Sequence, residues 1–277
     1  MSLTLYLRLL RMSRISVMAW GVILGLWGVL VVSIYPSISH GMGDGMEGYI
    51  EAMPQGMKAA FGLGGPEDLH LIFDGGSFTL PGYLNVEYLA WLPLVLGIYS
   101  VVYCGGLISK EYERGTLASL LSQPLSRNTF FLTKFLVFAT QMSIILIASL
   151  LTIGGATYLT GEAVDNSNLL LVHVVALFAT LSIAGYSTLP SCIFLDSGRS
   201  LALAGFITAF GYFLNILGGS IQEVSALKFF SIFYYYDSLE IIGKGTIDGA
   251  GILLYSSILA GSIGSSLVLF SRKDLTS

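Results

Sequence analysis

Few residues in this chain have the types and spacing that chemistry at a site requires. The three histidines, His40, His70 and His173, are far apart and show no spacing typical of a metal site. For His173 we expect a hydrogen-bonded role near the membrane interface rather than metal ligation. The two cysteines, Cys104 and Cys192, lie in apolar runs, so packing is their expected role. The sequence therefore predicts neither a metal site nor a disulfide framework.

Motifs for nucleotide binding and catalysis are not found either. There is no GxxxxGK[ST] phosphate loop, because the GKGT run at Gly243–Thr246 lacks the upstream glycine. HExxH, CxxC and GxSxG are missing as well. No ionisable residue lies well inside an apolar run, which argues against a transporter driven by protons or sodium. We therefore expect no enzyme and no cofactor bound by this chain.

The one charged and patterned interruption between two long apolar runs is Ser109–Lys134, SKEYERGTLASLLSQPLSRNTFFLTK. Its first part, Ser109–Arg114, continues the preceding apolar helix, and Gly115 has the permissive backbone that ends a helix. Thr116 can cap a new helix, and Ser126 can cap the one that follows. The pattern predicts a helix, a sharp bend and a second, short helix.

The short helix has a leucine face. Pro124 closes it, and three leucines recur at helical spacing: Leu117, Leu120 and Leu121. A helix of this length is not stable alone in water, so its apolar face needs a partner groove. We expect that partner to be a protein in the cytosol.

Composition shows which elements must position this stretch. The chain of 277 residues is 54% hydrophobic and only 11% charged, whereas a soluble domain carries about 25% charged residues. Six apolar runs approach or exceed the roughly 20 residues that a membrane-spanning helix needs. They are residues 15–35, 86–108, 135–159, 169–194, 200–217 and 250–270. We expect an all-α polytopic membrane protein in which residues 1–277 form a single transmembrane domain, with outer loops at 36–85 and 218–249.

The orientation follows from the positive-inside rule. With both termini in the cytoplasm, ten of the thirteen Lys and Arg residues fall inside. They are Arg8, Arg11, Arg14, Lys110, Arg114, Arg127, Lys134, Arg199, Arg272 and Lys273. The same arrangement places thirteen of the seventeen acidic residues outside. We predict six spans with both termini cytoplasmic.

Three segments outside these spans have a character of their own. Leu3–Arg14 fits a helix at the cytoplasmic interface or the start of the first span. In the first outer loop, apolar side chains spaced by four predict a helix over 49–61, and Pro54 fits a helix start better than a helix interior. The aromatic segment Gly218–Gly249 predicts a short outer helix or a partial re-entrant hairpin.

Polar and small residues inside the spans have two interpretations. Gln141, Thr208 and Asn215 either line a passage or form hydrogen bonds between helices, and the second role is more common. Gly21 and Gly25 form a GxxxG pair, which permits close helix approach and is a weak signal for a dimer seam.

The charged stretch also resembles a known family. Its pattern, E-x-x-x-G-T-L-x-x-L-L-x-x-P-x-S-R-x-x-x-x-x-x-K after the second span, is similar to the cytoplasmic signature of type-2 ATP-binding-cassette (ABC) transporter permeases. The matching residues are Glu111, Gly115, Thr116, Leu117, Leu120, Leu121, Pro124, Ser126, Arg127 and Lys134. Weaker similarity extends to YIEAMPQGMKAAFG, FSIFYYYDSL and the closing FSRKDL.

The resemblance implies the transmembrane architecture of type-2 exporters and a permease in a prokaryotic plasma membrane. Such a permease pairs with a second permease, preferably a copy of itself, and with two cytosolic ABC ATPase subunits that bind ATP and magnesium. The helix after the second span would be the coupling helix that docks on the ATPase. Its face would be the three leucines, with Glu111 and Arg114 fixing the bend above it. No nucleic-acid partner is implied.

Export of an amphipathic or hydrophobic compound, such as a drug, antibiotic, peptide or lipid, is the activity that the resemblance favours. A membrane scaffold that recruits a cytosolic ATPase or other partner without transport fits the same topology. The two hypotheses differ in whether ATP turnover by the partner depends on a translocated compound.

Overall fold

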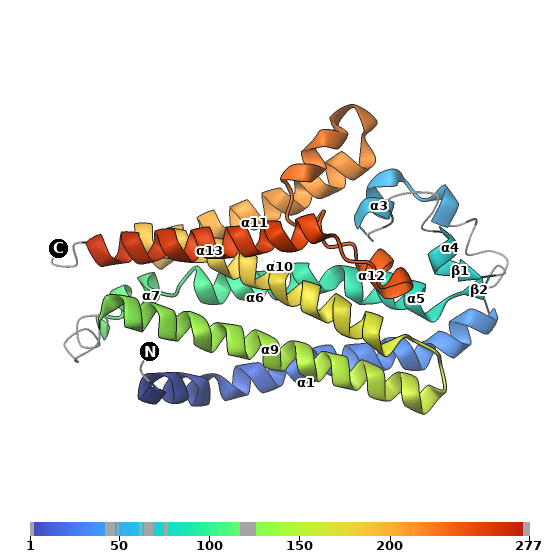
Figure 1. The fold of residues 1–277 in the computed structure, drawn as a ribbon, viewed down its shortest axis with the longest axis horizontal. Coiled ribbons are helices and arrows are strands. Elements are labelled where there is room, and N and C mark those ends of the chain that lie inside the picture. The colour runs from blue at the N-terminus through green and yellow to red at the C-terminus, as the bar shows by residue number, and fades with distance from the viewer. Residues whose placement is uncertain are drawn as a thin grey trace.

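Among the residues that the computed structural model describes, six helical segments are long and apolar enough to cross a membrane. The structure describes residues 3–41, 48, 50–60, 63, 69–74, 77–116 and 126–273. Five of the crossings are single helices: α1 (Leu3–Gly41), α9 (Arg127–Thr160), α10 (Asn166–Ile193), α11 (Ser197–Ser220) and α13 (Gly249–Arg272). They lie roughly along one axis, as Figure 1 shows. The all-α polytopic fold expected from the apolar runs is confirmed.

The crossing at Leu80–Glu113 consists of several short helices, although the sequence shows one apolar run there. The pieces are α5 (Leu80–Glu87), the 3-10 helix η2 (Leu89–Trp91), α6 (Leu92–Cys104) and α7 (Ser109–Glu113). Tyr88, with φ −139° and ψ −61°, leaves helical geometry, and Pro93 lies in the first turn of α6, where a missing N–H costs little. At the other end, residues 105–108 form a turn between α6 and α7.

The first span packs against α9 along a glycine stripe. A side chain at Gly25 or Gly28 would meet α9 residues: its Cβ would lie 3.1 Å from Thr152 Cγ2 or 2.6 Å from Ile153 Cγ1, respectively. The GxxxG pair therefore supports a helix contact inside this chain. Residues Leu3–Arg14 belong to the same unbroken helix as the first span, as the second of the two alternatives expected.

The buried core lies between α6, α9 and α10. Leu96 of α6, Phe138 and Met142 of α9 and Ala176 of α10 are inaccessible to solvent, and they belong to one apolar cluster that extends to α1 and α13. By contrast, α11 and α13 are the least buried of the six crossings.

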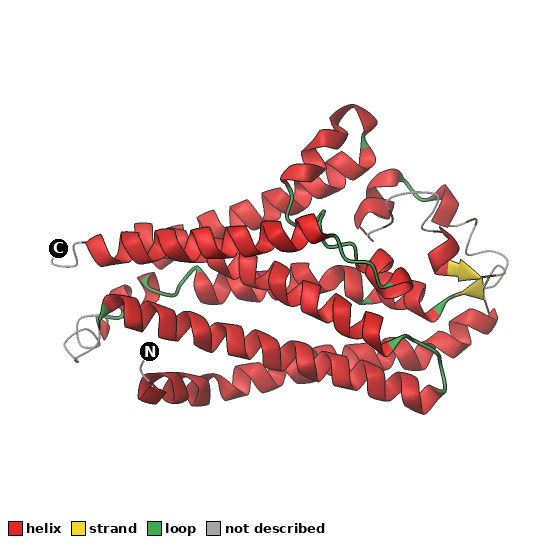
Figure 2. Cartoon of the chain, in the orientation of Figure 1, coloured by secondary structure: helices red, strands yellow, loops and turns green. Residues whose placement is uncertain are grey.

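One end of the bundle carries all the short elements that follow the first and fifth spans (Figure 2). They are α3 (Gln55–Ala60), α4 (Leu69–Ile72), the antiparallel strands β1 (Phe73–Asp74) and β2 (Ser77–Phe78), the 3-10 helix η3 (Gln222–Phe230) and α12 (Ser238–Lys244). Pro54 begins α3, since its carbonyl accepts from the N–H groups of Met57 and Lys58, as predicted. The prediction of one helix over 49–61 was wrong, because the chain leaves helical geometry at Met53 and Pro54. Tyr49, Phe61 and Gly62 of the predicted helix lie outside the described residues. The aromatic segment after α11 contains short helices, one of the two forms expected.

Candidate functional site

The predicted bend between the second and third spans lies at the end of the bundle where α1 begins and α13 ends (Figure 1). Gly115 adopts φ +68°, a left-handed conformation that suits glycine, and directly follows Arg114, the C-cap of α7. Ser126 caps α9, because its hydroxyl accepts from the N–H of Thr129 at 3.1 Å. The positions of the bend and of the next helix start are therefore as predicted.

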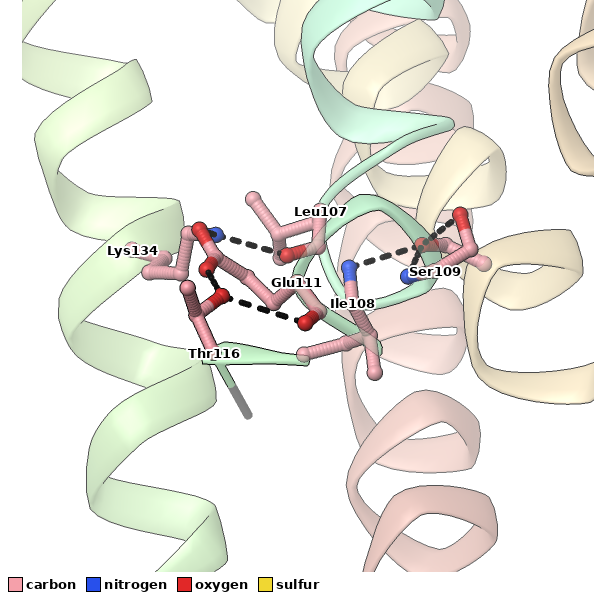
Figure 3. Close-up of polar contacts among 7 residues, drawn as sticks. Leu107, Ile108, Ser109, Glu111, Thr116 and Lys134 are labelled. Carbon is pink, nitrogen blue, oxygen red and sulfur yellow. Dashed lines mark hydrogen bonds and ion pairs between the residues drawn. The ribbon is translucent and has the colours of Figure 1, made fainter. Parts of the chain in front are cut away.

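The centre of this end is an ion pair between Glu111 of α7 and Lys134 of α9. The Lys134 ammonium donates to Glu111 Oε1 at 2.9 Å and to the Leu107 carbonyl oxygen at 2.7 Å. Only 9% of the lysine side chain and 21% of the glutamate side chain are exposed. The ammonium also lies 5.4 Å from the centre of the Phe130 ring. Figure 3 shows the two side chains meeting between α9 and the turn before α7.

The Glu111 carboxylate also contacts Thr116, the residue after the bend. The Thr116 hydroxyl contacts Glu111 Oε2 and lies 3.1 Å from the Glu111 carbonyl oxygen (Figure 3). Thr116 thus binds backward to Glu111. Because Glu111 binds α9 on one side and Thr116 on the other, it fixes the direction in which the chain leaves α7.

The turn between α6 and α7 is fixed by α10. Ser191 Oγ accepts from the N–H of Ile108 at 2.8 Å and from the N–H of Ser109 at 3.2 Å. Ser109 and Ser191 are fully buried. These two N–H groups have no helical partner of their own at the start of α7, so the serine satisfies donors that would be costly to bury unpaired.

Glu113 connects α7 to the start of α11. Its carboxylate accepts from the N–H and from the hydroxyl of Ser197, both at 2.6 Å. Asp196 caps the same helix through the N–H of Arg199 at 2.7 Å. Two carboxylates at a helix N-terminus are favourable because the first N–H groups are unpaired and the helix dipole is positive there.

Arg127 connects the start of α9 to the end of α13. Its Nη1 donates to the carbonyl oxygen of Lys273 at 2.6 Å, with longer contacts to those of Phe270 and Ser271. The Lys273 ammonium in turn donates to the carbonyl of Ile193, the last residue of α10, at 2.6 Å. Carbonyl groups at helix ends lack intrahelical partners, so these cations satisfy them.

Four residues of the predicted docking helix lie outside the described residues: Leu117, Leu120, Leu121 and Pro124. What the structure describes is the base of that segment on both sides. At this base, residues 107–116 and Arg127 contact α9, α10, α11 and α13.

The three polar residues proposed for a passage are separated. Gln141 joins helices, since its amide donates to Ser13 Oγ of α1 at 2.8 Å and accepts from the Tyr99 hydroxyl at 3.0 Å. Thr208 of α11 shares a 2.7 Å hydrogen bond with Tyr186 of α10. Asn215, by contrast, lines a cavity at the opposite end of the bundle. The first two contacts have the form of hydrogen bonds between helices, and the passage role stays a prediction.

His173 is hydrogen-bonded, as expected, but it lies inside the bundle. It is 3% exposed and contacts Ser149 Oγ at 3.0 Å and the Leu169 carbonyl at 2.8 Å. Among the described residues, no group of three or more His, Cys, Asp or Glu side chains is placed to hold a metal ion.

Several residues of this end were not identified as partners from the sequence. The roles of Ser191, Ser197 and Glu113 follow from how distant helices meet, and no local pattern indicates them. For Glu111 and Lys134 the sequence did contain a signal. Glu111 follows the end of one apolar run, and Lys134, with the opposite charge, precedes the next run. Because consecutive helices usually lie side by side, these two residues are expected to come close together.

The fold and this end of the bundle define a polytopic membrane protein with a polar junction built around the loop after its second span. The family comparison specifies the class: the model of the ABC-2 family transporter proteins matches residues 32–275, and the chain belongs to that family. It is therefore a membrane component of an ABC transporter. No curated protein matches the chain.

Proposed function

We propose that this chain is the permease subunit of an ATP-driven exporter. It works with a second permease, a copy of itself, and with two cytosolic ABC ATPase subunits. The transported compound is amphipathic or hydrophobic. Both termini and the loop after the second span face the cytoplasm, in a prokaryotic plasma membrane.

The observation that carries the proposal is the set of contacts at the base of residues 117–125. Glu111 binds α9, the α6–α7 turn binds α10 through Ser191, Glu113 binds α11, and Arg127 binds α13. A force on the segment between Gly115 and Ser126 therefore reaches four spans through direct polar contacts. This arrangement suits a coupling element, which must bias how helices are placed according to the state of its partner.

The distribution of arginine and lysine supports the proposed cytoplasmic side of the bundle. The arginines and lysines at the starts of α1, α9 and α11, in α7 and at the end of α13 lie at the same end of the bundle. Cytoplasmic segments are the ones enriched in these residues. ATP and magnesium belong to the partner, because the sequence has no phosphate loop of its own.

The experiment replaces Leu117 by Asp and by Met in the full chain. A charge on the docking face is expected to abolish copurification of the ATPase, while the volume-conserving Met variant keeps it. Both variants are expected to insert and to elute as monodisperse protein in mild detergent. Wild-type copurification and wild-type transport in Leu117→Asp would contradict the coupling role.

The same preparation distinguishes the exporter hypothesis from the scaffold hypothesis. In proteoliposomes, ATP turnover by the complex is expected to rise with a transported amphiphile. Stable association with an ATPase whose turnover responds to no added compound, together with no transport, would favour the scaffold. A mass measurement of the intact complex tests the expected two permeases and two ATPases.

A further inference from the structure

A cavity of about 580 Å³ lies at the end of the bundle opposite the Glu111–Lys134 pair. Its walls come from α11, from η3 and the aromatic segment after it, from α3, from η2 and from the first turn of α6 (Figure 1, where η3 is the orange helix beside the end of α11). Pockets of this volume bury a small organic molecule. Neither the family match nor the contacts of the α7 end assign a role to it.

Close backbone packing forms the cavity wall. A side chain at Gly218 of α11 would place its Cβ 2.5 Å from the backbone nitrogen of Lys228, so η3 can lie against α11 only because this residue is glycine. A Cβ at Gly56 of α3 would lie 2.8 Å from Ser220 Oγ of α11. Gly218 and Gly56 therefore allow η3 and α3 to lie directly against α11.

One part of the wall is aromatic. Tyr212 and Phe233 meet edge to face with ring centres 5.3 Å apart, and Tyr234 and Tyr236 line the same cavity. Aromatic walls give an apolar body a large contact area. The Tyr236 hydroxyl is buried and has no hydrogen-bond partner among the residues that the structure describes.

Two charged side chains line the cavity, Asp237 and Lys228, and they differ in their contacts. Asp237 is engaged in capping α12, since its Oδ1 accepts from the N–H of Glu240 at 3.0 Å. Lys228 lies over two rings, 5.1 Å from the centre of Tyr234 and 5.6 Å from that of Phe229. Among the described residues, the ion pairs join Lys134 to Glu111 and Lys244 to Glu240, and none includes Lys228. Within this described part of the chain, the wall thus offers a cation that forms no direct ion pair, while the carboxylate of Asp237 in the same wall caps α12.

We propose that this cavity binds an amphipathic molecule that carries one anionic head group. The head group lies at Lys228, and the apolar body lies against Tyr212 and Phe233. A membrane lipid and a dissolved amphiphile share this chemistry. The proposal goes beyond the permease function, because binding here requires neither the ATPase nor transport.

The test uses the full chain in a neutral detergent and a diazirine-bearing fatty acid, with its methyl ester as the uncharged probe. After photolysis, labelled peptides are identified by mass. The variants are Lys228→Gln, which removes the cation, and Ala90→Phe, which fills space at the wall. Lys244→Gln is the matched control, because Lys244 is also a lysine of this end but does not line the cavity and is paired with Glu240.

The acid is expected to label cavity peptides of the wild type and of Lys244→Gln at the same concentration. In Lys228→Gln the half-saturating concentration should rise about tenfold or more, while labelling by the ester, weak throughout, should not change. Ala90→Phe should reduce labelling by both probes. Unlabelled cavity peptides in the wild type, or equal labelling of Lys228→Gln and wild type, would overturn the proposal.

A competition arm identifies the source of the ligand. Displacement of the probe by phosphatidylglycerol and not by phosphatidylcholine would indicate a membrane lipid. Displacement by a soluble alkyl sulfate alone would indicate a dissolved amphiphile. Either result supports anionic recognition, and displacement by phosphatidylcholine as effectively as by the anionic competitors would contradict it. Loss of ATPase copurification would leave all these outcomes unchanged, so the two proposals fail independently.

Discussion

Replacing Glu111 by Gln is the sharpest perturbation of the α7 end, because it removes one charge and little volume. The Lys134 ammonium would then remain in a largely buried position with the Leu107 carbonyl and the Phe130 ring as its partners. Removing one partner of a fully buried ion pair costs about 3–5 kcal/mol. Since the glutamate side chain is 21% exposed and the lysine keeps a carbonyl, we expect a loss of about 2 kcal/mol, near the low end for charged hydrogen bonds.

This loss is measured as the temperature at which half of the detergent-solubilised chain stops eluting as a monodisperse peak. For a chain of this size a loss of 2 kcal/mol corresponds to about 4–8 °C. Heating a membrane protein is irreversible, so the values rank variants measured at one heating rate. Glu113→Gln is the control, because Glu113 is in α7 too but binds the start of α11 through exposed contacts, so it should lower the melting temperature less than Glu111→Gln does.

A double variant tests whether the two charges act on each other. Lys134→Met in the Glu111→Gln background removes the stranded cation, so the fall in melting temperature of the double variant should be smaller than the sum of the two single falls, as a coupling of about 1–2 kcal/mol would give. Strictly additive losses, or a Glu111→Gln protein that melts within about 1 °C of the wild type, would refute the assignment of a stabilising buried pair.

Three further predictions use the same melting measurement. Gly115→Ala should cost about 1 kcal/mol, because φ is +68° and a Cβ there meets no atom of the described residues within 4 Å, so the expected cost is conformational; Gly115→Asn should cost less. Ser191→Ala should cost about 2 kcal/mol by leaving two N–H groups unpaired, whereas Ser187→Ala, one turn earlier, removes only a bond to its own helix and should cost less. Gly28→Val should cost about 1–3 kcal/mol by separating α1 from α9, while Gly21→Ala, whose Cβ would lie at an ordinary 3.5 Å from its neighbour, should be tolerated.

Local signals in the sequence predicted the elements well. The apolar runs located the six crossings, because a membrane helix must satisfy its backbone internally and present apolar side chains. Gly115, Ser126 and Pro54 marked a bend and two helix starts, because their backbone or side-chain chemistry acts within a few residues. The break at Tyr88 was not predicted, since Pro93 is compatible with a helix start or with a kink.

The contacts between elements could not be predicted in the same way. Glu111 and Lys134 are separated by 23 residues, and Glu113 and Ser197 by 84. Such pairs depend on which helices become neighbours and on their rotation, and both are decided by packing along whole helices. The GxxxG pair illustrates the same limit: its spacing indicated close approach, but not that the partner would be α9 of the same chain.

The position of α11 connects the two ends of the molecule. It is among the least buried of the crossings, so the described part of this chain covers only a small share of its surface. At one end Glu113 holds its first turn through the backbone and side chain of Ser197. At the other end Gly218 lies against the Lys228 backbone, and Asn215 lines the cavity. If the loop after the second span moves with its partner, the Glu113 contact requires the start of α11 to follow or the hydrogen bonds to break. Because a helix is stiff over its length, a tilt at that end would change the width of the cavity at the other, so a ligand held at Lys228 would favour one tilt of α11 over another.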